Sequence, residues 1–149
     1  MSENPTNHVG ALEAICAQSR CGSRSIASSP PHGGITARIR SAVGAMILLT
    51  NDDGIDAPGF RALYRALRRD TGHAVLAVAP LHERSGMGHA ISVDRALTVS
   101  CRSEPGFFGF VIDGTPTDCT KLALDRLCPM APELVVSGIN RGPNVGRSV

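Results

Sequence analysis

Short apolar runs separated by polar, glycine-containing segments dominate the chain after residue 45. The first two runs, at 46–50 and 74–79, are continuously hydrophobic, which is typical of parallel strands buried on both faces. Between them, an apolar stripe at helical spacing predicts a helix over about 57–69. The stripe consists of Phe60, Leu63, Tyr64 and Leu67. This order predicts a β-α-β unit with parallel strands and a right-handed connection.

The second half of the chain continues the alternation. Apolar runs at 107–112 and 134–137 predict two further strands. Between them, the sequence indicates the start of a helix. Thr115 is the expected N-cap and Pro116 the first helical residue, and the Asp118 side chain can bond back to the N-cap backbone N–H. The stripe of that helix would consist of Cys119, Leu122, Ala123 and Leu127. Residues 90–100 alternate weakly and predict an extended arm or a hairpin, so the fold class is α/β.

Residues 1–45 differ from the remainder of the chain. They are rich in Ser, Gly and Pro, contain four arginines and two acids, and show no sustained period. Three interpretations remain: a disordered tail, a transit-like segment, or an upstream start with Met46 as the true beginning. The first and third are favoured because no clean amphipathic pattern is present. We therefore expect a leader at 1–45 and one domain at 46–149.

Composition excludes several classes of partner. The residues from Met46 onward hold 11 acids and 11 Lys or Arg, so no concentrated basic face points to a nucleic acid polymer. No run approaches the roughly 20 apolar residues that span a membrane, and no secretory signal is recognisable. The five cysteines lack C-x-x-C spacing, which argues against a zinc site and a disulfide framework. A cytoplasmic location fits these features best.

Polar loops follow three of the predicted strands. Asp52 and Asp53 end the first, a loop around Ser85 follows the second, and a loop around Asn140 follows the last. Two adjacent carboxylates at a buried strand end repel each other, and a divalent cation with oxygen ligands is the simplest countercharge. Because the carboxyl ends of parallel strands share one edge, we expect the three loops to converge there.

Four segments of these loops and their strands resemble the SurE family (survival protein E) of metal-dependent 5′-nucleotidases. They read ILLTNDDGIDAPG, AVAPLHERSGMGHAIS, DGTPTDCTKLAL and PELVVSGINRGPNVG, in the order of the family. The resemblance implies a Rossmann-like parallel three-layer α/β sandwich. Because family members are longer than this chain, residues 46–149 would be the N-terminal part of a SurE-like phosphatase domain. The sandwich would then be incomplete. The resemblance also implies that Asp52, Asp53, Ser85 and Asn140 are the metal ligands.

An all-oxygen ligand set suits Mg²⁺ or Mn²⁺ better than zinc. The expected reaction is hydrolysis of nucleoside 5′-monophosphates, with Asp52 or Asp53 as the catalytic carboxylate that takes a proton from water. Asn144 and Gly86 are candidate substrate contacts, since a glycine lets backbone N–H groups approach phosphate oxygens. His82 and His89 are expected to be loop residues without a ligand role.

Two other hypotheses remain open. The chain can be a non-catalytic remnant that keeps the metal ligands but lacks the phosphate pocket, and the homo-oligomer typical of the family is then doubtful. It can also be a receiver-like domain in which Asp113, after a later strand, accepts phosphate. The second is disfavoured because no predicted helix separates residues 80 and 106.

Overall fold

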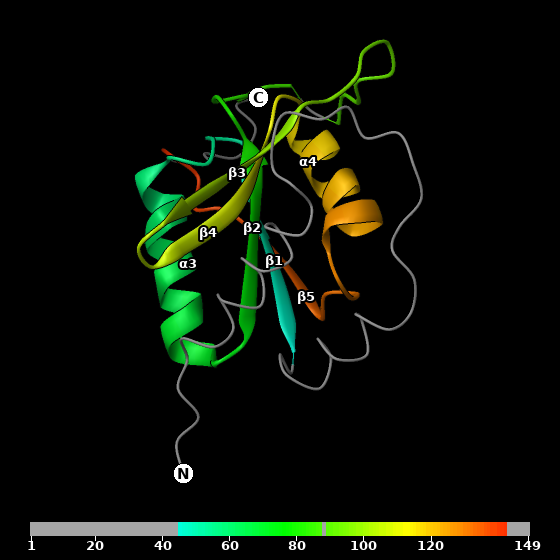
Figure 1. Cartoon of the computed structure of the whole chain (residues 1–149). Coiled ribbons are helices and arrows are strands. Elements are labelled where there is room, and N and C mark those ends of the chain that lie inside the picture. Colours follow the sequence, from blue (N-terminus) through cyan, green and yellow to red (C-terminus); the bar gives the residue numbers. More distant parts are fainter. Residues whose placement is uncertain (1–44, 88, 143–149) are drawn as a thin grey trace, which may run out of the picture.

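A five-stranded sheet with a helix on each face forms the body of this computed structural model, which describes residues 45–87 and 89–142 (Figure 1). The predicted leader, apart from Ala45, and the candidate substrate contact Asn144 lie outside the described residues. The elements in chain order are β1 (Met46–Thr50), α3 (Pro58–Thr71), β2 (Ala74–Pro80), β3 (Val99–Glu104), β4 (Phe107–Ile112), α4 (Pro116–Leu122), the π-helix η1 (Ala123–Leu127) and β5 (Leu134–Ser137).

The strand order in the sheet is β3-β4-β2-β1-β5. Strand β1 pairs in parallel with both β2 and β5, and β2 pairs in parallel with β4, which confirms the parallel core. Strand β3 pairs antiparallel with β4, so the sheet is mixed rather than wholly parallel. Of the segment 90–100, expected to be an extended arm or a hairpin, only Val99 and Ser100 lie in a strand, and β3 continues from them to Glu104.

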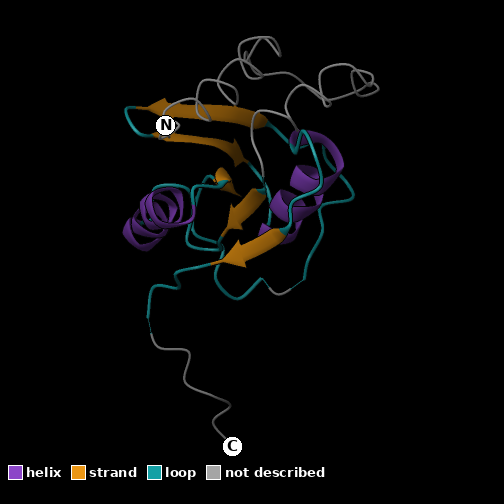
Figure 2. Cartoon of the chain, turned by 90° about the horizontal axis from the view of Figure 1, so that it is seen from below, coloured by secondary structure: helices purple, strands orange, loops and turns teal. Residues whose placement is uncertain are grey.

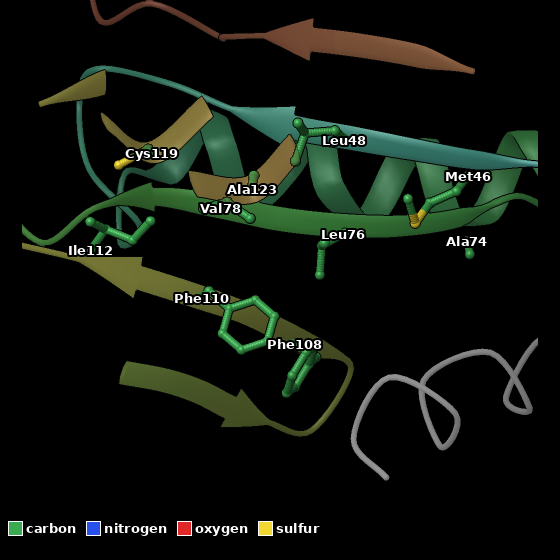
Figure 3. Close-up of a cluster of buried hydrophobic side chains, with 10 residues drawn as sticks. All are labelled: Met46, Leu48, Ala74, Leu76, Val78, Phe108, Phe110, Ile112, Cys119 and Ala123. Carbon is green, nitrogen blue, oxygen red and sulfur yellow. The ribbon is translucent and has the colours of Figure 1, made fainter. Parts of the chain in front are cut away.

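The two faces of the sheet carry separate cores. One cluster joins β1, β2 and β4 to Cys119 and Ala123 of the second helical segment (Figure 3). The other joins the opposite face to Phe60 and Tyr64 of α3, with Leu63 and Leu67 partly buried beside them. Figure 2 shows the two helices on opposite sides of the strands. These layers confirm the predicted Rossmann-like sandwich.

Both helices begin as their sequences indicate. Helix α3 has Pro58 in its first turn and ends at Gly72, whose positive φ of 66° is easily adopted by glycine. Helix α4 begins with a complete capping box between Thr115 and Asp118. Its predicted continuation to Leu127 is a π-helix rather than an α-helix. Cys119, Leu122, Ala123 and Leu127 all pack against one core cluster, as the stripe predicts.

The cysteines of the described region differ in state. Cys119 and Cys128 are free, and burial raises the pKa of the Cys119 thiol to about 12 and that of Cys128 to about 11. Neither thiol is therefore a reactive thiolate at neutral pH. Cys101 is disulfide-bonded, so the expectation against disulfides is wrong for this residue.

Arg61 of α3 ties the helix to the β3–β4 hairpin. Its side chain is 12% exposed, donates from Nε to the Ile55 carbonyl oxygen at 2.9 Å, and pairs with Asp56 at 2.7 Å and Glu104 at 3.2 Å. The guanidinium also lies 3.5 Å from the centroid of the Phe107 ring, which is a cation–π distance. One side chain thus links three segments.

Arg61→Ala is expected to lower the free energy of unfolding by about 1–3 kcal/mol, because the part-buried hydrogen bond to Ile55, the ion pairs and the ring contact are lost together. Urea denaturation followed by circular dichroism measures the change. Arg65→Ala removes an exposed arginine from the same helix and is expected to change stability by less than about 0.5 kcal/mol. Equal effects of the two substitutions would show that the Arg61 contacts add nothing.

Candidate functional site

A cavity of about 950 Å³ opens at the carboxyl ends of β1 and β5. Thr50, Asn51 and Asp52 line it from β1, and Ser137 to Asn140 line it from β5. Arg84 and Gly86 reach it from the loop after β2, and Pro116 with Thr117 from the start of α4. The structure therefore brings Asp52, Gly86 and Asn140 of the predicted site to one cavity.

Backbone hydrogen bonds hold the three loops beside one another. The Arg84 N–H donates to the Asp52 carbonyl oxygen at 2.8 Å, and the Gly138 N–H donates to the Thr50 carbonyl oxygen at 3.0 Å. The Arg141 N–H donates to Asp53 Oδ2 at 2.9 Å. Asp53 does not line the cavity itself, but this bond attaches its carboxylate to the residue after Asn140. The loops converge as the parallel topology predicts.

Ser85 is the second predicted ligand, after Asp53, that does not line the cavity. Its hydroxyl is exposed and donates to Glu83 Oε1 at 3.0 Å, while its neighbours Arg84 and Gly86 both line the cavity. A hydroxyl that donates one hydrogen bond keeps its oxygen lone pairs for another partner. Its role as a ligand therefore stays a prediction.

The residues present fit a hard cation. Asp52 and Asp53 supply half-buried carboxylates, and Asn140 donates from Nδ2 to the Gly142 carbonyl oxygen at 3.1 Å, so its amide oxygen is the atom suited to a cation. Within residues 45–87 and 89–142, no three His, Cys, Asp or Glu side chains form a metal cluster. A cation at this edge would thus need the neutral oxygens of Ser85 and Asn140 to complete its ligand set.

Two buried oxygens at the end of β1 have no hydrogen-bond partner among the described residues. They are Thr50 Oγ1 and Asn51 Oδ1, and both residues line the cavity. Asn51 is held in place because its Nδ2 donates to the Gly54 carbonyl oxygen at 2.9 Å. Buried polar atoms without partners are costly, and they are typical of places where a ligand or ordered water completes the bonding. Sequence reasoning did not single out these residues or Arg84.

His89 also lines the cavity, whereas His82 does not. Thr117 and Thr120 line it as well, since α4 begins at Pro116 beside the strand ends. Asp113, the phosphate acceptor of the receiver-like hypothesis, instead pairs with Arg84 at 3.5 Å and Arg95 at 3.1 Å.

Asp118 fastens the loop after β2 to α4. Its carboxylate is 2% exposed and accepts hydrogen bonds from the Thr115 N–H at 2.9 Å, the Ser92 N–H at 3.0 Å and the Ser92 hydroxyl at 2.8 Å. Burial by itself raises the pKa of the Asp118 carboxyl, but these hydrogen bonds outweigh it and hold the pKa below its usual value. Asp118 is therefore a structural anion, as its place in the capping box indicates.

Asp118→Asn is expected to lower the free energy of unfolding at pH 7 by about 1–3 kcal/mol, since an ionised acceptor is lost from buried donors. Because the folded pKa is depressed, this stabilisation is complete above the unfolded value of about 3.9 and is lost as pH falls through the folded pKa. The difference from the wild type should therefore shrink in acid. Urea denaturation from pH 7 to pH 3 measures it, with exposed Asp94→Asn as control. A difference independent of pH contradicts the assignment.

Comparisons with known proteins match this part of the chain. A family model described as Survival protein SurE matches residues 47–149. A 5′-nucleotidase SurE from Desulfovibrio desulfuricans is 54% identical over 103 residues, covering 69% of this chain and 40% of the relative. Another from Solidesulfovibrio magneticus is 56% identical over 100 residues, covering 67% and 39%. The chain thus spans about two fifths of the length of these relatives.

A solved structure gives the same result. The crystal structure of the SurE protein from Aquifex aeolicus superposes with a TM-score of 0.55 and 40% sequence identity, covering 68% of this chain and 40% of that one. No helix of the described segments is long and apolar enough to cross a membrane. The family model over residues 47–149, together with the relatives and the solved structure, shows that the chain belongs to the SurE family.

Proposed function

We propose that the protein is a metal-dependent phosphatase that hydrolyses nucleoside 5′-monophosphates to nucleoside and phosphate. The observation that carries this proposal is the meeting of Asp52, Gly86 and Asn140 at one cavity, with Asp53 attached beside it by the Arg141 N–H. Its support from outside the chain is that relatives at 54% identity bear the name 5′-nucleotidase SurE. Residues 46–149 would then be the N-terminal part of the phosphatase domain.

The chemistry follows from the donors at the strand ends. Asp52, Asp53, Ser85 and Asn140 would hold Mg²⁺ or Mn²⁺, which supplies polarisation of a phosphoryl oxygen and a lowered pKa of bound water. Asp52 or Asp53 would accept the proton of the attacking water. Gly86, whose positive φ of 79° presents its backbone without a side chain, would approach the phosphate, and Asn144 is a second proposed substrate contact.

Phosphate release by the purified full chain tests the proposal. We expect turnover of nucleoside 5′-monophosphates with Mn²⁺ or Mg²⁺, its loss on adding EDTA, and its return with excess cation. Nucleoside 3′-monophosphates are the control, because they test whether hydrolysis depends on the position of the phosphate on the ribose. Turnover that persists after complete removal of divalent cations would contradict a metal-dependent mechanism.

The second candidate is a cation-binding protein without turnover, supported by the oxygen donors of Asp52 and Asn140 at one cavity, which suit a hard cation by themselves. Calorimetric titration with Mn²⁺ distinguishes the two. Binding that Asp52→Asn abolishes, in a chain that releases no phosphate, would support this candidate. We also propose a cytoplasmic location, which fractionation of cells that express the chain tests. Native mass spectrometry of the purified chain tests whether it forms the homo-oligomer expected for the family.

A further inference from the structure

Arg84 is a cationic residue that a backbone bond places against a predicted ligand and that also lines the cavity. Its N–H donates to the carbonyl oxygen of Asp52 at 2.8 Å, and it lines the same cavity as Asp52, Gly86 and Asn140. The bond fixes the start of the Arg84 side chain beside the end of β1. A positive charge is therefore built into this edge of the sheet by the fold itself.

The Arg84 guanidinium has few partners for a partly buried cation. Within the described residues its side chain has one polar contact, from Nη2 to Asp113 Oδ1 at 3.5 Å. Its Nε is buried and has no hydrogen-bond partner in the part of the chain that the structure describes. The side chain is 33% exposed, so part of the guanidinium remains accessible. Most of its five donors are thus available for a ligand.

Asp113 does not depend on Arg84 for its countercharge. Arg95 donates from Nη1 to Asp113 Oδ2 at 3.1 Å and from Nη2 to the Asp113 carbonyl oxygen at 2.7 Å. These bonds are shorter than the Arg84 contact, and Arg95 does not line the cavity. Arg84 can therefore turn toward a ligand while Asp113 stays neutralised, at the cost of one weak contact.

We propose that Arg84 binds the phosphate group of the substrate through its guanidinium. A planar fork of donors matches two oxygens of a phosphate, and such charge-assisted bonds are stronger than neutral ones. The proposal rests on the phosphatase function above and adds to it the residue that holds the phosphate from the side of the β2 loop. The nearby Asp52 carboxylate repels an anion, so binding to Arg84 is expected to be strongest with Mg²⁺ present.

Binding of inorganic phosphate and of a nucleoside 5′-monophosphate to the full chain, measured by calorimetry in saturating Mg²⁺, tests the proposal. Arg84→Gln is expected to weaken both roughly 10- to 100-fold, the loss typical of charge-assisted hydrogen bonds. Arg84→Lys keeps the positive charge but lacks the planar fork of donors. Its affinity for both ligands should therefore lie between those of the wild type and Arg84→Gln. Arg95→Gln, which alters the other arginine on Asp113, should stay within about threefold of wild type. Thermal unfolding verifies that each variant folds.

The outcomes separate this inference from the proposed function. Phosphate binding that depends on Arg84 in a chain without turnover supports the inference and contradicts the function. Turnover and phosphate affinity unchanged by Arg84→Gln support the function and overturn the inference. A wild-type chain that binds neither phosphate probe at millimolar concentration overturns the inference, as does an equal loss in Arg84→Gln and Arg95→Gln.

Discussion

Asp52→Asn in the full chain is expected to lower phosphate release from nucleoside 5′-monophosphates by at least about 10³-fold. The amide has nearly the shape of the carboxylate but lacks the charge that holds a divalent cation at the end of β1. Stabilisation of transition-state charge by a cation amounts to several kcal/mol, and each 1.36 kcal/mol corresponds to a factor of ten. The measurement is initial-rate phosphate release in saturating Mn²⁺.

Asp94→Asn is the matched control, because it makes the same chemical change at an exposed residue away from the cavity. It should leave the rate within about twofold. Mn²⁺ titration of the Asp52 variant should show weakened binding in parallel with the lost rate. An Asp52 variant with a rate within threefold of wild type would mean that this carboxylate does not take part in the reaction.

Leu76→Ala is expected to lower the free energy of unfolding by about 2–5 kcal/mol. Leu76 is fully buried at the centre of β2, opposite Leu48 of β1, and belongs to the core under α4 (Figure 3). Removing its side chain opens a cavity between the sheet and the helix, and the surrounding strands relax only in part. The expected loss is a large fraction of the roughly 5–15 kcal/mol typical of a domain.

Urea denaturation of the full chain measures this loss as a lower midpoint. Leu124→Ala is the control, since Leu124 is 47% exposed on η1 and should cost less than about 0.5 kcal/mol. Similar midpoints for the two variants would show that the sheet face under α4 is not the core on which the fold depends.

Hydrophobic pattern was sufficient to locate the strands that lie inside the sheet. β1, β2 and β4 are buried along their whole length, so each appears in the sequence as an uninterrupted apolar run. β5 was also located, although Leu134 and Val135 are 53% and 45% exposed. It pairs with β1 alone among the described strands, which leaves its outer side less covered.

The start of β3 was not predictable from the pattern. Residues 90–98 alternate much as a strand does, but the structure holds this segment by side-chain bonds instead of a ladder. Asp118 accepts from Ser92, and the Thr115 hydroxyl donates to the Ala90 carbonyl oxygen at 2.6 Å. These contacts join residues about 25 positions apart, so no local period in the sequence contains them.

Some residues of the candidate site were also predictable from the sequence, and others were not. Asp52 and Asn140 follow directly from strand ends, and parallel pairing of β1 with β5 is enough to bring them to one edge. Arg84 lies in a loop whose path depends on its backbone bond to Asp52, and the burial of Asn51 Oδ1 depends on the turn closed at Gly54. Such positions need tertiary structure to be recognised.

The most direct test of the account is a crystal structure of the full chain with Mn²⁺, read from the anomalous signal of the metal. One peak is expected at the carboxyl ends of β1 and β5, with oxygens of Asp52, Asp53, Ser85 and Asn140 at coordination distance, roughly 2.0–2.3 Å as for small hard cations. No peak at this edge at saturating Mn²⁺, or a peak held by other side chains, would contradict the shared cation site.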